Sequence, residues 1–164
     1  MRIDTRHNLP ATVSTVWQEL FSEDYLEALY GQSNTTTQRL RDEVRNGRRF
    51  IQSRITLGRK LPATASKLLK AQHLSYIFEE HLDESTHTVR WRVIVDRVSD
   101  KVTASGTYQL IATGDTCDRI VRGEIRVNVP FIGRKIEQGI CTELTKSYET
   151  AARFAREWLR NKQQ

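Results

Sequence analysis

The feature that most constrains the fold is an amphipathic stretch near the end of the 164-residue chain. From Ile132 to Leu159, apolar residues recur at steps of three and four positions, which predicts one continuous helix. Its roughly 28 residues are more than twice the ~11–12 typical of globular proteins, and at ~1.5 Å per residue the helix is roughly 42 Å long. Because so long an apolar stripe needs a wide partner, we expect the helix to lie across a curved sheet.

Most of the remaining chain alternates between apolar and polar residues, the pattern of strands with one buried face. Residues Arg2–Leu9 predict a first strand that Pro10 ends, and ATVSTVWQEL and SEDYLEALYG then predict two short helices, the second with Ser22 as its N-cap. Six further strands follow, with Asn46-Gly47 as a hairpin turn between the first two. Their close spacing favours antiparallel pairing.

The segment LPATASKLLKAQ interrupts these strands, and we expect it to form one or two helical turns begun by Pro62. The length and 38% hydrophobic content suit a single domain spanning residues 1–164. The expected fold class is therefore α+β, with seven antiparallel strands around a long C-terminal helix.

Composition limits the classes of partner and compartment. The net charge of +6 raises the expectation of anionic partners, but no RNP-like, zinc-finger or helix-turn-helix pattern accompanies it, which disfavours nucleic acid. Cys117 and Cys141 lack C-x-x-C spacing and fit a reducing compartment. Without an apolar leader or a stretch of ~20 apolar residues, the sequence predicts a soluble, cytoplasmic protein.

Residues with catalytic or cofactor-binding chemistry are sparse. The four histidines show no metal-ligand spacing and no glycine-rich phosphate loop is present, so we expect neither a metal nor a cofactor. His7, on the inner side of the first strand, could be a buried base or a hydrogen-bonded core histidine. The carboxylate pairs, Glu79 and Glu80 among them, are expected to be solvated, and no catalytic residue is assigned.

The order of elements resembles the START-like, birch-pollen-allergen-like helix-grip superfamily (SRPBCC), in which a curved seven-stranded sheet wraps the C-terminal helix around an apolar cavity. The motifs LPATASKLLKAQHLSYIFEEHLD and VPFIGRKIEQGI resemble a bacterial branch, domain of unknown function 2505. Superfamily members bind lipids, sterols, hormones or polyketides, and a minority catalyse cyclisation or hydrolysis. The resemblance therefore implies binding of a hydrophobic small molecule, lipid or sterol-like, for transport or sensing.

Two other functions stay open. One is a cyclase- or hydrolase-type enzyme on a similar substrate, with His7, Tyr76, Tyr108 and Tyr148 as candidate acids or bases; the other is an interaction domain without a ligand. For ligand binding, inward strand positions and the helix stripe predict a lining made of Leu40, Ile55, Tyr76, Phe78, Trp91, Val93, Tyr108, Leu110, Ile125, Val127, Ile136, Ile140, Leu144 and Tyr148.

Basic residues also gather around two predicted loops. Arg134 and Lys135 begin the long helix just after Phe131, and Lys67 and Lys70 lie in the inserted helical turn. Cations beside an apolar opening favour peripheral contact with an anionic membrane. These five residues are therefore candidates for membrane docking, although the same charges could simply be solvated.

Overall fold

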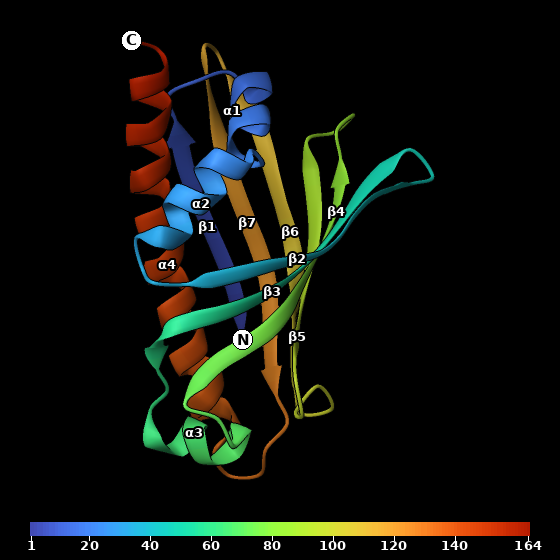
Figure 1. The fold of residues 1–164 in the computed structure, drawn as a ribbon, viewed down its shortest axis with the longest axis vertical. Coiled ribbons are helices and arrows are strands. Elements are labelled where there is room, and N and C mark those ends of the chain that lie inside the picture. The colour runs from blue at the N-terminus through green and yellow to red at the C-terminus, as the bar shows by residue number, and fades with distance from the viewer.

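A seven-stranded antiparallel sheet and one long helix dominate the structure, a computed structural model of residues 1–164 (Figure 1). The strands are β1 (Arg2–Leu9), β2 (Thr36–Arg45), β3 (Arg48–Lys60), β4 (His73–Asp83), β5 (Thr88–Val95), β6 (Val102–Thr113) and β7 (Thr116–Val127). The helices are α1 (Val13–Leu20), α2 (Glu23–Gly31), α3 (Ala63–Leu69) and α4 (Gly133–Lys162). The strand order is β1-β7-β6-β5-β4-β3-β2, so β1 lies beside the last strand and the others form a meander.

Local sequence chemistry explains where several elements begin and turn. Ser22 caps α2, because its side chain accepts a hydrogen bond from the backbone N–H of Tyr25. Asn46 and Gly47 both have positive φ, 52° and 75°, the conformation that a two-residue hairpin needs. Pro62 directly precedes α3. The predicted first strand, short helices, hairpin turn and long helix are confirmed.

Strand β2 does not follow the predicted alternation. A register shift between Arg39 and Arg41 interrupts its pairing with β3, and all ten of its residues are exposed. Leu40 falls in this irregularity and is 40% exposed, so its assignment to an interior wall is wrong. Val44, on the same strand, is 74% exposed because the β2–β3 hairpin projects beyond the body of the sheet (Figure 1).

The buried core is divided into two clusters on the inner face of the sheet. The upper cluster joins α1, α2 and the end of α4 to the sheet; its largest members include Leu9, Val16, Trp17, Ile51, Leu110 and Leu159. The lower cluster consists of Ile3, Trp91, Ala104, Val121, Ile125, Val127 and Cys141. Tyr108 packs against both clusters and belongs to the site described below.

Helix α4 covers only part of the sheet closely. Its close backbone contacts with strands are concentrated on β1 and β7. Strands β2, β3 and β4 curl across the front of the molecule toward the helix (Figure 1). An ion pair between Arg59 Nη2 and Glu143 Oε2, 2.6 Å apart, joins β3 to α4. Neither α4 nor another helix is both long and apolar enough to cross a membrane.

Trp91 lies flat against the sheet because two facing residues have no side chain. Gly106 on β6 and Gly123 on β7 are cross-strand partners. A Cβ atom at Gly123 would lie 2.6 Å from Trp91 Cζ2, and one at Gly106 would lie 2.7 Å from the same atom. The two glycines thus allow an indole to form the floor of the lower cluster.

Candidate functional site

Two charged residues point into the interior from the sheet. Strand register places Glu80 opposite Ile51 and Trp91, and Arg119 opposite His7 and Leu110, all on the inner face. Strand alternation makes this orientation unavoidable once the neighbouring apolar residues face the core. The interior between the two core clusters therefore contains a carboxyl group and a guanidinium group.

Glu80 is a carboxyl group without a hydrogen-bonding partner in the protein. Burial raises its pKa from the usual 4.5 to about 7, although the positive charges of Arg39 and Arg49 act in the opposite direction. Its side chain nevertheless keeps some accessible surface. A group that is strongly desolvated and yet keeps some accessible surface lies in a recess rather than on an open surface.

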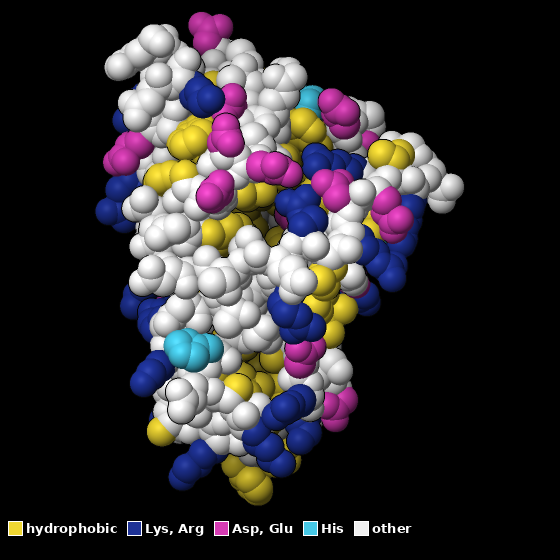
Figure 2. Space-filling view, in the orientation of Figure 1, with side chains coloured by type: hydrophobic (Ala, Val, Ile, Leu, Met, Phe, Trp, Pro, Cys, Tyr) yellow, Lys and Arg dark blue, Asp and Glu magenta, His cyan; other side chains and the backbone are white.

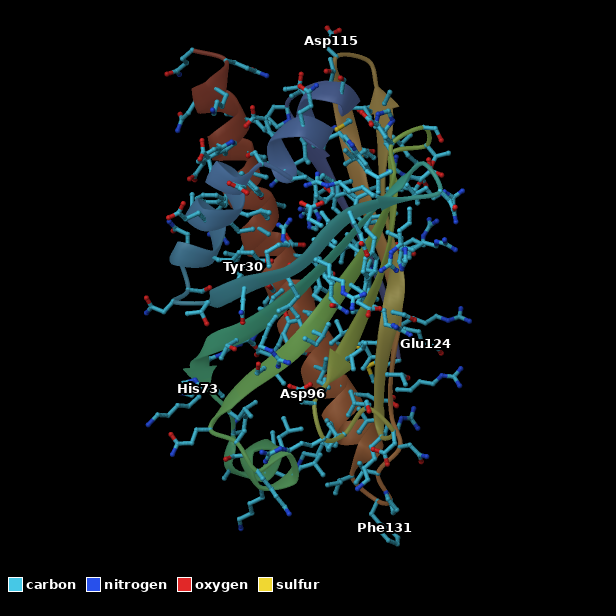
Figure 3. The ribbon with its side chains drawn as sticks, turned by 45° about the vertical axis from the view of Figure 1, so that its right-hand side comes forward. Tyr30, His73, Asp96, Asp115, Glu124 and Phe131 are labelled. Carbon is cyan, nitrogen blue, oxygen red and sulfur yellow. The ribbon has the colours of Figure 1, made fainter.

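Three tyrosines from three different elements surround Glu80. Tyr30 lies in the last turn of α2, where Figure 3 shows it beside α4, while Tyr76 lies on β4 and Tyr148 on α4. Burial raises the pKa values of Tyr76 and Tyr148 to about 12 and that of Tyr30 even further, and the charge of Glu80 contributes to all three shifts. None of these hydroxyl groups forms a hydrogen bond within the protein, so all three are free to bind a ligand or water.

Arg119 is the most deeply buried cation of the site. Its side chain is 4% exposed, and its one hydrogen bond runs from Nη2 to the carbonyl oxygen of Tyr148 at 3.1 Å. The buried Nε has no acceptor. The guanidinium carbon lies 5.9 Å from the ring centre of Tyr108, whose hydroxyl also lacks an aligned partner.

His7 lies on the inner face, as its position in the alternation predicted. It is 5% exposed, and its Nε2 is 3.2 Å from Glu149 Oε1 on α4. Neither ring nitrogen has a well-aligned hydrogen bond. His7 is therefore a buried histidine at an ion-pair distance from an exposed carboxylate, next to Arg119 in the sheet.

Most residues of the predicted lining lie around the interior. Trp91, Ile125 and Val127 belong to the lower core cluster, Leu110 belongs to the upper one, and Ile55 is buried. Others pack against the lower cluster but are only half-buried: Phe78, Val93, Tyr108, Ile136, Ile140, Leu144 and Tyr148. We call the region between these half-buried side chains the interior space.

One row of α4 faces this space. Ile136, Ile140, Leu144 and Tyr148 follow each other at four-residue steps and therefore form a line along the helix. Tyr148 is close enough to Glu80 for the carboxylate charge to affect its pKa, so this line faces β4. Figure 2 shows hydrophobic side chains recessed behind the strands that cross this face, with acidic and basic side chains around the openings.

Several site residues were not predicted, although strand alternation placed some of them inward. Glu80 shares a face with Tyr76 and Phe78, and Arg119 with Val121. The expectation that Glu79 and Glu80 are solvated is wrong for both: Glu79 is 9% exposed and pairs with Arg92 at 2.6 Å on the outer face. Tyr30 could not be found from alternation, because its position depends on how α2 packs.

Two depressions on the molecular surface differ in character from the interior space. One, of about 390 Å³, has no hydrophobic lining residue and is formed by Arg48, His81, Asp83, Thr86, Thr88, Arg90 and Gln109. The other, of about 550 Å³, lies near the N-terminus and is lined by Met1, Asp100, Lys101, Thr103, Arg126, Val127, Asn128 and Glu137. Polar and charged residues form most of the lining of both, so neither suits a hydrophobic molecule.

Comparison with known sequences identifies the family. Residues 4–159 match the profile of the family described as "Protein of unknown function (DUF2505)". The chain belongs to the DUF2505 family. No curated protein matched the sequence.

Solved structures similar to this DUF2505 protein include three with informative names. The Zhui aromatase/cyclase from Streptomyces sp. R1128 aligns at 8% identity over 100% of this chain and 96% of its own, with a TM-score of 0.73. A START superfamily protein from Mycobacterium smegmatis aligns at 14% identity over 96% and 98%, with a TM-score of 0.65. Norcoclaurine synthase from Thalictrum flavum aligns at 16% identity over 97% and 86%, with a TM-score of 0.63. These similarities confirm the START-like helix-grip fold.

Proposed function

We propose that this DUF2505 protein binds a hydrophobic small molecule in the interior space between α4 and the curled half of the sheet. The observation that carries the proposal is the incomplete burial of Phe78, Val93, Ile140 and Leu144, which face inward from both walls. A fully packed core would bury such side chains. An apolar ligand would complete their burial.

The energetics favour an apolar ligand with a few polar atoms. Each Å² of apolar surface removed from water contributes roughly 25 cal/mol, before the costs of association. Tyr30, Tyr76 and Tyr148 then offer hydroxyl groups that can orient the polar part of the molecule. A lipid, sterol or polycyclic aromatic compound fits this combination.

A panel of neutral hydrophobic probes tests the proposal by calorimetric titration, with 1-naphthalenemethanol and decanol as its first members. We expect saturable binding of one molecule per chain by at least one probe, with a negative heat-capacity change. In parallel, native mass spectrometry and solvent extraction of the purified protein would identify a co-purified ligand. Absence of binding across the panel would favour the alternative of an interaction domain without a ligand.

Catalysis on the bound molecule is a second candidate function, favoured by Glu80. A carboxyl group with a pKa of about 7 can both donate and accept a proton near neutral pH. Tyr76 and Tyr148 adjoin it, and two structural neighbours bear the names of an aromatase/cyclase and a synthase. We propose Glu80 as the proton-transfer group if the protein turns over its ligand.

Contact with an anionic membrane would give such a ligand a route into the protein. Phe131 is fully exposed at the turn between β7 and α4 and points away from the body (Figure 3). Arg134 and Lys135 follow it, and α3 lies at the same end of the molecule (Figure 1), with Lys67 exposed. None of these cations forms an ion pair with an acidic side chain in the structure, so their charges are available to a negatively charged surface.

Reversal of two charges tests this contact. Arg134→Glu combined with Lys135→Glu should weaken binding to vesicles containing phosphatidylserine by roughly 10- to 100-fold, since each cation near the surface contributes ~1 kcal/mol. The matched control, Arg153→Glu with Arg160→Glu, changes two exposed cations toward the other end of α4 and should have a much smaller effect. Vesicle co-sedimentation measures binding. Equal losses of vesicle binding in both variants would show that binding depends on the net charge of the protein and not on this contact site.

A further inference from the structure

We propose that Arg119 forms an oxyanion subsite, so that the hydrophobic ligand of this protein carries a carboxylate or a comparable anionic oxygen. The inference rests on the proposed function and adds the chemical class of the ligand. It follows from the surroundings of Arg119 rather than from the size of the interior space.

The charge of Arg119 has no counter-ion in the protein. Its side chain is 4% exposed, yet it takes part in none of the ion pairs, and its one protein hydrogen bond goes to an uncharged carbonyl at Tyr148. A guanidinium has several N–H donors in a planar fork, and most of them are unused here. Burial of an unpaired charge costs several kcal/mol, which makes a bound anion the natural complement.

Nearby acidic residues are engaged or face elsewhere. Asp118 precedes Arg119 but points to the outer face, where it accepts a hydrogen bond from Arg6 at 2.7 Å. Glu149 lies 3.2 Å from His7 Nε2 and is itself 61% exposed. Glu80 is not within ion-pair distance of Arg119. No acidic side chain of the protein therefore neutralises the charge of Arg119, and a bound anion would do so.

Other unpartnered polar groups adjoin Arg119 in the sheet. Thr5 and His7 on β1 and Tyr108 on β6 face inward at neighbouring register positions. Thr5 Oγ1, His7 Nδ1 and Arg119 Nε lack hydrogen-bond partners. His7 Nε2 has only the exposed carboxylate of Glu149 at 3.2 Å, and the Tyr108 hydroxyl lies near Arg119 without an aligned hydrogen bond. Because unsatisfied buried polar groups are rare in folded proteins, these atoms beside the unpaired charge of Arg119 indicate a missing polar ligand.

The same arrangement orients the ligand. Its anionic end would accept hydrogen bonds from the guanidinium, which matches the geometry of a carboxylate. Its apolar part would extend along the line of Ile136, Ile140 and Leu144 on α4. Glu80, on β4, carries a negative charge when ionised, so the anionic end of the ligand is favoured beside the positive charge of Arg119 on β7.

Matched pairs of probes test the subsite: 1-naphthoate against 1-naphthalenemethanol, and decanoate against decanol, titrated calorimetrically. Charged hydrogen bonds are strong enough for each acid to bind roughly tenfold or more tightly than its neutral partner. Arg119→Met should reduce this preference to about twofold or less, whereas Arg119→Lys, which keeps the charge but not the fork, should retain part of it. Arg122→Met, on the outer face of the same strand, is the control and should retain the full preference.

Stability of the free protein separates a binding role from a structural one. If Arg119 awaits an anion, Arg119→Met should leave the midpoint of thermal unfolding unchanged or raise it, because an uncompensated buried charge is removed. A clear decrease in the midpoint, or equal binding of acids and neutral probes, would overturn the subsite. Binding of neutral probes without a preference for acids would leave the proposed function intact, and binding of neither would contradict both.

Discussion

Replacement of Leu144 by tryptophan is expected to abolish uptake of hydrophobic probes while the protein stays folded. Leu144 is half-buried and lies in the line of α4 side chains that faces β4. A larger indole at this position would occupy the interior space instead of displacing a packed side chain. Affinity for 1-naphthalenemethanol should fall at least tenfold, with circular dichroism and the unfolding midpoint close to those of the unchanged protein.

The control for this substitution is Ser147→Trp. Ser147 is exposed on another side of α4, so its replacement adds the same indole without entering the interior. Ala155 is not suitable for filling the space, because it is fully buried in the upper core cluster and a larger side chain would disrupt packing. If Leu144→Trp binds probes as well as Ser147→Trp, the interior space is not where they bind.

Glu80→Gln should change how stability depends on pH. The folded pKa of Glu80 is raised to about 7 from the usual 4.5, so the folded protein holds a proton that the unfolded chain has released between these values. The free energy of unfolding therefore falls as pH rises through this window and stays lower above it. Glutamine has no such penalty, so the variant should be more stable at pH 8, by on the order of 2 kcal/mol, and nearly equal at pH 4.

Denaturant unfolding at a series of pH values measures this difference. Glu124→Gln provides a control, because Glu124 lies on the outer face and pairs with Arg126 at 3.0 Å. Subtraction of the stability profile of Glu80→Gln from that of the unchanged protein isolates the contribution of Glu80 from those of the other titrating groups. Parallel profiles for the protein and Glu80→Gln between pH 4 and pH 8 would mean that Glu80 is not desolvated.

The fold could be predicted largely from local patterns. Strict alternation defines most strands, Asn46-Gly47 has the positive φ angles of its turn, and the three- and four-residue steps after Phe131 define α4. Strand β2 was the exception, because a bulge beside Leu40 breaks the two-residue period and an edge strand has little burial to maintain it. The bulge and the exposure of β2 depend on its contacts with β3 rather than on its own residues.

The apolar lining was easier to predict than the polar site. Most hydrophobic residues expected at inward positions are buried or half-buried, and Leu40 is the exposed exception. Glu80 and Arg119 occupy the same alternating positions, but Glu80 was expected to be solvated, as charged residues usually are, and Arg119 was not singled out. The register with the neighbouring strands confirms the inward orientation that alternation implies. Tyr30 joins them through the packing of α2, which no local pattern describes.

Methyl NMR spectroscopy tests the central claim most directly, because it locates a bound probe within the protein. With isoleucine methyl groups labelled and 1-naphthalenemethanol or 1-naphthoate added, we expect the largest chemical-shift changes at Ile136 and Ile140, which face the interior space. Ile94 and Ile111, on the outer face of the sheet, should change little. Changes confined to the outer isoleucines, or no change at any of them up to the solubility limit of the probes, would contradict a ligand site between α4 and the curled sheet.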